Sequence, residues 1–279
     1  REVLAGNGTE HGGVYLDVTH RGADFIRRKL PSMYEQFHAL GDVDITAQPM
    51  EVYPTIHYTM GGVRAEPETA ATTLPGLYAA GEVSAGVHGA NRLGGNALCD
   101  LLVFGRRAGE AAAQYAQSVA PGTLDEAAIQ EEAASLLAPF ESAGTENPYV
   151  ITEELQAAMQ EGAMIARTEE SLQKCLNTVL ELQQRAHNLH VEGSRVYNPG
   201  WHTARDIHNM LKISEIIVRC ALERKESRGA QWRLDYPNPD PEWAKKNLIA
   251  TRQRDTVRIT TTPVPALPPE LAKLFEEAH

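Results

Sequence analysis

Two apolar stripes at helical spacing mark the middle of the chain. One lies within residues 207–221. The other consists of Leu172, Cys175, Leu176, Val179 and Leu182. Because residues three and four apart share one face of an α-helix, each stripe predicts a helix with one buried face. With a further helix near residues 124–137, they predict a bundle of about three antiparallel helices, with Pro148 and Pro199 in the connections.

The rest of the pattern mixes short strands, loops and helices. It predicts helices at residues 23–40 and 96–118, the second ended by Pro121 and Gly122. It also predicts short strands at residues 14–18, 77–80 and 256–262. Residues 229–279 are rich in proline and are otherwise expected to be irregular. The predicted fold class is therefore α/β plus all-α.

Composition narrows the class of protein. The 279 residues are 42% hydrophobic and carry a formal net charge of −11, so a core can form and a nucleic-acid partner is disfavoured. The sequence has no apolar run long enough to span a membrane. Cys99, Cys175 and Cys220 form no CxxC pair and lie in apolar helical patterns. This usage predicts reduced, buried thiols in a reducing compartment.

Glu82 is the first candidate for binding chemistry. The stretch PGLYAAGE ends a predicted buried strand with Gly81 and Glu82. In an open α/β sheet, ligands bind at the carboxyl ends of strands, where a carboxylate can accept hydrogen bonds from sugar hydroxyls. A solvated glutamate after an ordinary strand explains these eight residues equally well.

The stretch HGANRLGGN precedes the helix predicted at residues 96–118. Gly94 and Gly95 allow the backbone to approach a ligand closely, and Asn96 is expected to cap the helix. Free N–H groups at a helix start favour a group that becomes negative during a reaction, such as a reduced flavin ring. Gly105 and Gly109 share one face of this helix and would let another element pack closely.

His57 and Arg92 are the candidates for holding an anionic substrate. An arginine binds a carboxylate in a bidentate manner and a histidine adds a donor, so the pair can clamp a carboxylate if the two converge. A lone histidine beside a strand is more often structural. The HxxH pair of His187 and His190 is not completed by a cysteine or acidic pattern, so no metal site is predicted.

Three long motifs carry a family resemblance. In chain order, HYTMGGV, GLYAAGEVSAGVHGANRLGGNALCDLLVFGRRAG and RKESRGAQWRLDYP resemble the flavoprotein subunits of succinate dehydrogenase and fumarate reductase. The resemblance covers essentially the whole chain and corresponds to the C-terminal half of such a subunit. It implies FAD-dependent hydride transfer between flavin and a dicarboxylate, succinate or fumarate. It also implies two partners, a membrane anchor and an iron–sulfur subunit, with the flavoprotein cytoplasmic or peripheral on the cytoplasmic face of the inner membrane.

By match of motif, the resemblance implies roles for five residues. His57 and Arg92 correspond to ligands of the substrate carboxylates. Glu82 corresponds to a ligand of the FAD sugar or ribityl hydroxyls. Ala97 and Leu98 correspond to backbone donors to the flavin ring.

The resemblance also implies a division into domains. Residues 1–46 resemble the end of a mobile capping domain, and residues 47–120 resemble the returning segment of a Rossmann-like FAD-binding domain. Residues 121–228 would form the helical bundle, and residues 229–279 would form an irregular C-terminal segment.

Other functional groups of the family are expected upstream of Arg1. The glycine fingerprint, the histidine that often links FAD covalently and the proton-shuttle arginine have no match within these residues. No catalytic residue is therefore assigned here. The chain is expected to be a fragment or a processed product that binds little FAD and is inactive by itself.

Two positions depart from the pattern of many family members, which have serine at Ala97 and histidine at Gln231. A backbone contact survives the first change, whereas glutamine at 231 cannot carry a charge. Two alternative functions stay open. One is an L-aspartate oxidase with the same His/Arg clamp, and the other is a non-catalytic helical module for assembly.

Overall fold

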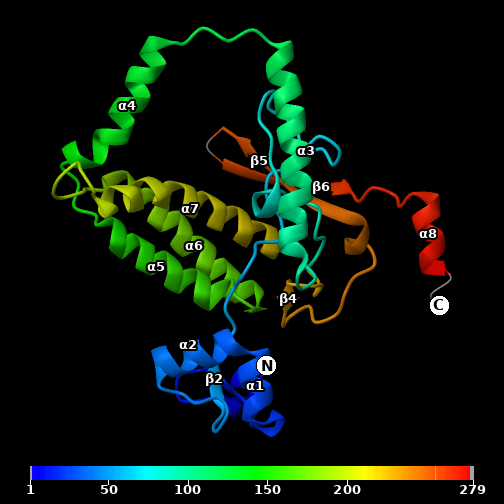
Figure 1. Cartoon of the computed structure of the whole chain (residues 1–279). Coiled ribbons are helices and arrows are strands. Elements are labelled where there is room, and N and C mark those ends of the chain that lie inside the picture. The colour runs from blue at the N-terminus through cyan, green and yellow to red at the C-terminus, as the bar shows by residue number, and fades with distance from the viewer. Residues whose placement is uncertain (1, 255, 277–279) are drawn as a thin grey trace. The chain divides into compact units, whose positions relative to one another are not determined.

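The computed structural model describes residues 2–254 and 256–276. The chain divides into two compact units, Arg1–Thr59 and Met60–His279 (Figure 1). This division by packing does not test the assignment to capping, FAD-binding and helical domains, which stays a prediction.

The smaller unit packs short helices against a two-stranded sheet. Its core is formed by Ile26, Ile45 and Met50. Strands β1 and β2 pair antiparallel, with Val14 opposite Val52. The elements in chain order are the helical turn η1 (Val3–Asn7), β1 (Val14–Leu16), η2 (Thr19–Arg21), α1 (Ala23–Lys29), α2 (Pro31–Gly41) and β2 (Met50–Val52).

The helix predicted at residues 23–40 is wrong as one continuous element. It is broken into α1 and α2 at Leu30, whose φ and ψ are −128° and 44°. A residue before proline is disfavoured in the helical region, and Pro31 lacks the N–H needed to continue α1. Pro31 instead begins α2, where a missing N–H costs nothing.

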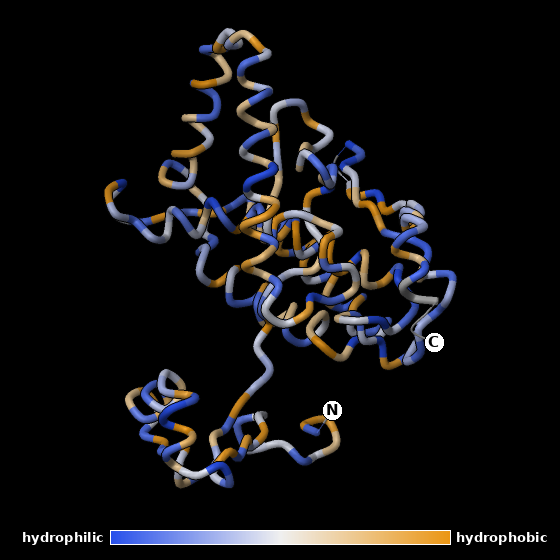
Figure 2. Tube along the Cα trace, turned by 45° about the vertical axis from the view of Figure 1, so that its right-hand side comes forward, coloured by the Kyte–Doolittle hydropathy of each residue, from blue (hydrophilic) through white to orange (hydrophobic). Residues whose placement is uncertain are grey.

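A three-helix bundle forms the main core of the larger unit. Helices α5 (Pro148–Gly162), α6 (Glu169–Arg185) and α7 (Pro199–Glu223) pack against one another (Figure 1). Both predicted stripes face the core. Every residue of the stripe on α6 is at most 6% exposed, and on α7 Ile207 and Val218 are fully buried while Met210 and Ile217 are partly buried. Figure 2 shows hydrophobic positions interspersed with hydrophilic ones along the coils of the trace. The predicted bundle is therefore present.

The identity of one helix in the bundle differs from the prediction. Pro148 and Pro199 do not lie in connections but occupy the first turns of α5 and α7, each after an asparagine cap. The helix predicted near residues 124–137 exists as α4 (Glu126–Glu141), yet it only borders the bundle, where Trp201 Nε1 donates to the Leu136 carbonyl at 2.7 Å.

The remaining elements of the larger unit precede the bundle in sequence, lie between its helices or follow it. The helix predicted at residues 96–118 has those bounds, and the strand predicted at 256–262 is confirmed. This strand, β6, forms an antiparallel hairpin with β5, and helix α8 follows it. The C-terminal segment is therefore less irregular than predicted. These elements are η3 (Gly81–Val83), α3 (Asn96–Ser118), β3 (Ala166–Arg167), η4 (Ala186–Asn188), β4 (Trp232–Arg233), η5 (Trp243–Lys245), β5 (Lys246–Gln253), β6 (Thr256–Pro263) and α8 (Pro269–Glu276).

Arg233 joins two helix ends of the bundle. Its side chain is fully buried and donates to both carboxylate oxygens of Asp235, each at 2.8 Å. It also donates to Glu169 at the start of α6, at 2.9 Å, and to the Ala221 carbonyl near the end of α7, also at 2.9 Å. The hydrogen bonds from Arg233 are the largest cause of a lowered pKa of Asp235, which is about 2 despite the opposing effect of burial.

Truncation of a buried α7 side chain is expected to destabilise the bundle. Ile207→Ala removes a fully buried side chain and should lower the free energy of unfolding by about 2–5 kcal/mol. Ile213→Ala is the matched control, because Ile213 lies on the same helix and is 53% exposed; its effect should stay below about 1 kcal/mol. Urea unfolding followed by circular dichroism measures both. Equal losses would contradict the packing described.

The contribution of Asp235 is expected to depend on pH. Its folded-state pKa of about 2 lies below the unfolded value of about 3.9, so its stabilisation is complete above about pH 5 and is lost as the pH falls toward 2. Asp235→Asn should therefore cost about 1–3 kcal/mol at pH 7, and this difference should shrink on acidification. Thermal unfolding from pH 7 to pH 2 tests this, with the exposed Glu131→Gln as control. A difference that is independent of pH would contradict it.

Candidate functional site

The five residues assigned to the site fall in both units. His57 belongs to Arg1–Thr59, whereas Glu82, Arg92, Ala97 and Leu98 belong to Met60–His279. The structure fixes the surroundings of each residue within its own unit. The convergence of His57 and Arg92 on one substrate stays a prediction.

His57 is an exposed residue beside a buried and strained one. Its ring lies 6.3 Å from the ring of Tyr58, centroid to centroid, in an edge-to-face arrangement. Tyr58 is 7% exposed and has a φ of 74°. A non-glycine residue in this left-handed region costs on the order of 1–3 kcal/mol. The backbone next to His57 is therefore conformationally strained.

Glu82 lies in the helical turn η3, with its side chain exposed. This turn packs directly on α3: a Cβ on Gly81 would stand 2.4 Å from Leu101 Cδ2, and Gly81 has a φ of 76°. The left-handed backbone favours glycine here, whereas the methyl group of the half-exposed Leu101 could move aside for a Cβ. The contact holds Glu82 close to the helix that carries Ala97 and Leu98.

The buried strand predicted at residues 77–80 is wrong. Tyr78 forms a single antiparallel bridge with Ala71, and Leu77 is 49% exposed. The chain reverses just before this segment, because the Leu77 amide donates to the Leu74 carbonyl at 3.0 Å. The apolar run was a sound signal for a strand, but within the described residues it lacks the neighbouring strands of a larger sheet.

The start of α3 has open backbone donors. Gly95, with a φ of 87°, is the residue that precedes the helix, and Asn96 is its first helical residue. The prediction that Asn96 caps the helix is therefore wrong, and Gly95 in the cap position has no side chain that could do so. The first N–H groups of a helix lack partners within the helix. The amides of Ala97 and Leu98 thus belong to an uncapped first turn.

One face of α3 is apolar and exposed. Leu98 and Leu102 are 70% and 75% exposed, and Leu101 beside them is about half exposed. Gly105 and Gly109 also meet open space, since no described atom lies within 4 Å of where a Cβ would stand. The close-packed neighbour expected at these two glycines is therefore not among the described residues.

Arg92 lies in a loop, residues 85–95, that is anchored at several points. The Ala85 amide donates to the Val63 carbonyl at 2.9 Å, which fixes the start of the loop. His88 Nε2 lies 3.2 Å from Asp100 Oδ2, and both side chains are largely buried. Asp100 was missed by sequence reasoning, although a carboxylate in the apolar run ALCDLLVF was a visible signal. The pair ties the middle of the loop to the first turns of α3.

The motif RKESRGAQWRLDYP packs against this loop. The Ala230 amide donates to the Ala90 carbonyl at 3.0 Å. Gln231 lies beside this contact and uses both ends of its amide: Oε1 accepts from Arg167, and Nε2 donates to the Ala221 and Arg224 carbonyls. Its observed bonds are thus those of a neutral residue that closes the end of α7.

The cysteines differ in burial. Cys175 is buried and Cys220 is partly buried, and desolvation raises the pKa of both thiols, that of Cys220 to about 11. Cys99 is exposed, so the prediction that it packs in an apolar interior is wrong. It lies in the first turn of α3, beside the exposed face described above, where the described part of the chain provides no cover.

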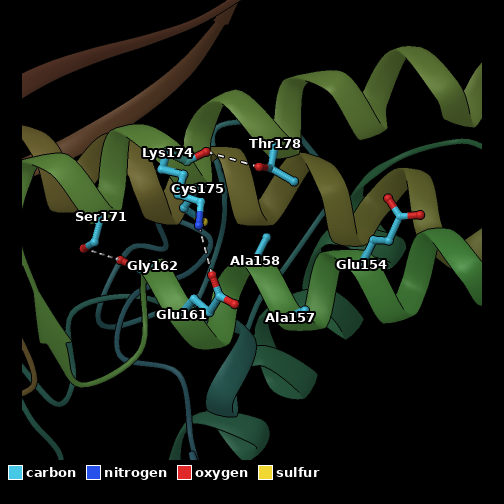
Figure 3. Close-up of a pocket in the computed structure, with 9 residues that line it drawn as sticks. All are labelled: Glu154, Ala157, Ala158, Glu161, Gly162, Ser171, Lys174, Cys175 and Thr178. Carbon is cyan, nitrogen blue, oxygen red and sulfur yellow. Dashed lines mark hydrogen bonds and ion pairs between the residues drawn. The ribbon is translucent and has the colours of Figure 1, made fainter. Parts of the chain in front are cut away.

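A pocket of about 330 Å³ lies between α5 and α6 (Figure 3). Lys174 and Glu161 form an ion pair of 3.3 Å beside it, and Ser171 Oγ donates to the Gly162 carbonyl at 3.1 Å. Cys175 also lines the pocket, but its raised pKa makes it a poor nucleophile at neutral pH. None of the five predicted site residues lines this pocket, so it gives no support to the site.

The residues near the start of α3 fit one side of a flavin nucleotide. They combine an exposed carboxylate at Glu82, open amides at Ala97 and Leu98, and glycines at 94 and 95 beside which the described chain leaves free space. Carboxylates accept from sugar hydroxyls, and helix-start amides stabilise negative charge. The donors and acceptors are therefore of the kind that FAD requires.

Two family models match the chain. Residues 152–271 match a model described as fumarate reductase flavoprotein C-term, and residues 3–98 match a model described as FAD binding domain. The chain belongs to the succinate dehydrogenase and fumarate reductase flavoprotein family. The prediction of FAD as the cofactor of this family is thereby confirmed.

Individual relatives agree with this assignment. A fumarate reductase (CoM/CoB) subunit of Methanothermobacter marburgensis is 42% identical over 91% of this chain and 46% of the relative. The Escherichia coli fumarate reductase flavoprotein subunit is 38% identical over 90% of this chain and 44% of the relative. Sdh1 of Mycobacterium smegmatis, solved in complex with UQ1, has a TM-score of 0.87 and 47% identity over 99% of this chain and 47% of its own. The chain thus spans less than half the length of each.

Membrane-spanning helices and metal clusters are both missing from the described residues. No helix in this part of the chain is both long and apolar enough to cross a membrane. Among the same residues, no group of three or more His, Cys, Asp or Glu side chains is arranged to hold a metal ion. His190 of the HxxH pair instead hydrogen-bonds the Ser142 carbonyl through Nδ1 at 2.8 Å.

Proposed function

We propose that this chain is the C-terminal part of an FAD-dependent oxidoreductase that interconverts succinate and fumarate. The observation that carries the proposal is the uncapped start of α3 with the anchored Arg92 loop directly before it, in a chain of this family. When bound, FAD supplies the hydride chemistry. The residues of this chain bind and orient the reactants.

Arg92 and His57 are proposed to hold the substrate carboxylates. A guanidinium forms two parallel hydrogen bonds to a carboxylate, which fixes both the position and the orientation of the dicarboxylate. His57 adds a further donor from the smaller unit.

Glu82, Ala97 and Leu98 are proposed to hold FAD. The exposed carboxylate of Glu82 would accept from sugar or ribityl hydroxyls, and the amides of Ala97 and Leu98 would face the flavin ring. The uncapped helix start would stabilise negative charge on the ring. Serine in place of Ala97, as in many relatives, would add a hydroxyl without changing the amide.

The partners are proposed from the family. Electrons would pass to an iron–sulfur subunit within a complex that carries a membrane anchor. Support for this comes from the similarity to flavoprotein subunits of fumarate reductases and to Sdh1, which was solved in complex with UQ1.

Loss of the Arg92 guanidinium should remove substrate binding selectively. In the complete flavoprotein, Arg92→Gln should lower kcat/KM for succinate at least about 30-fold, because truncation of one partner of a charge pair costs about 2–5 kcal/mol. His57→Asn should act in the same direction. Flavin content should be retained in both variants. Succinate-driven dye reduction measures the rates, and flavin absorbance measures the content.

Arg106→Gln is the control, because Arg106 is an exposed α3 residue whose guanidinium pairs with Glu110 one turn along the same helix. Its kcat/KM should match that of the parent protein. Unchanged kcat/KM in Arg92→Gln would contradict the proposal. Formation of peroxide from L-aspartate without succinate oxidation would favour an L-aspartate oxidase instead.

A polypeptide of these 279 residues alone is proposed to bind little FAD and to be inactive. The proposal is supported by the coverage of less than half of each relative and by the exposed apolar face of α3. The purified polypeptide should show little flavin absorbance. Limited proteolysis should cleave residues 2–120 first and leave the α5–α7 bundle protected. Stoichiometric flavin, or equal protection throughout, would contradict this.

A further inference from the structure

A tight turn in the motif RKESRGAQWRLDYP rests on the loop that carries Arg92. Arg228 and Gln231 exchange two backbone hydrogen bonds of 2.8 and 3.0 Å, which places Gly229 and Ala230 at the tip. The Ala230 amide then donates to the Ala90 carbonyl at 3.0 Å. The tip of the turn is therefore hydrogen-bonded to the backbone of Ala90, two residues before Arg92.

The contact is close enough to exclude any side chain at Gly229. A Cβ there would stand 2.3 Å from the Ala90 carbonyl oxygen and 2.6 Å from its carbon. Gly229 also has a φ of 58°, which disfavours other residues. Backbone thus packs directly on backbone, and neither side can yield by rotating a side chain.

The base of the turn is fixed by a buried carboxylate. Glu226 is fully buried and pairs with Arg224 at 2.6 Å and Arg228 at 3.0 Å. It also accepts from the Asp240 amide at 2.9 Å. On the other side of the turn, the side-chain amide of Gln231 donates hydrogen bonds to carbonyls at the end of α7. The turn is therefore rigidly attached to the helical bundle.

We propose that the turn Arg228–Gln231 is a positioning device for Arg92, transmitting the rigidity of the bundle to the substrate-binding guanidinium. This inference rests on the proposed role of Arg92 as a carboxylate ligand. Few rotatable bonds separate the fixed Ala90 carbonyl from the Arg92 Cα, so a displaced carbonyl displaces the guanidinium. A shift of about 1 Å at a positioning group can cost about 100-fold in rate.

Gly229→Ala in the complete flavoprotein tests the proposal. The new methyl group must push the Arg92 loop away from the turn. We expect kcat/KM for succinate to fall about 10- to 100-fold, mainly through KM, with flavin content retained. Amide hydrogen exchange of a peptide covering residues 86–95 should become at least about tenfold faster. Gly122→Ala is the matched control, because Gly122 has open space around it and no left-handed φ, and it should change neither quantity.

Arg228→Lys provides a milder variant if Gly229→Ala does not fold. Arg228 is about one-third exposed, so the protein should tolerate lysine, which cannot keep the hydrogen bonds to both Glu226 and the Asp240 carbonyl. Faster exchange of residues 86–95 and a raised KM are again expected. Unchanged exchange and an unchanged KM in a folded variant would overturn the proposal.

The outcomes separate this inference from the proposed function. If Arg92→Gln loses succinate turnover while Gly229→Ala changes neither exchange nor KM, the positioning role fails and the proposed function stands. If Arg92→Gln keeps full turnover, the assigned role of Arg92 fails. In that case the positioning proposal fails with it, even where exchange of residues 86–95 shows that the turn holds the loop.

Discussion

The closed C-terminal end of α7 is the constraint on which the rest of the larger unit depends. The last carbonyls of a helix have no partners within it. Here Gln231 and the buried Arg233 both donate to the Ala221 carbonyl, and Arg233 is neutralised by Asp235 and Glu169. A fully buried positive charge is tolerated here because all three nitrogens of the guanidinium donate hydrogen bonds. The same bonds fix the segment that follows α7.

The segment that follows α7 also contacts the chain more than a hundred positions earlier, just before α3. The Arg228–Gln231 turn meets Ala90, His88 meets Asp100, and Gly81 meets Leu101. Each contact joins elements that are irregular by themselves. The loop that bears Arg92 and the turn that bears Glu82 thus acquire definite positions without belonging to a sheet. This explains how a helical bundle with no assigned binding residue can still matter to a binding site.

Sequence reasoning succeeded where the signal is local and failed where it depends on neighbours. The bounds of α3 followed from a long helical pattern between glycines and Pro121, and both apolar stripes are buried. The break at Pro31 was missed because the pattern was taken as one helix running through this proline. Helix α5 was missed because Pro148 was assigned to a connection, whereas it lies in the first turn of the helix. The motifs identified the family and the five candidate residues. They did not reveal the contact of Asp100 with His88 or the contact at Gly229, since both depend on long-range packing that leaves no periodic trace.

The bare face of α3 has a consequence beyond binding. In the described chain, an exposed hydrophobic strip is formed by Leu98, Leu102, Gly105 and Gly109. A strip of this kind is a target for chaperones and for self-association while it is uncovered. Whatever segment or molecule comes to lie on this strip would therefore also govern how long the newly made polypeptide stays in solution.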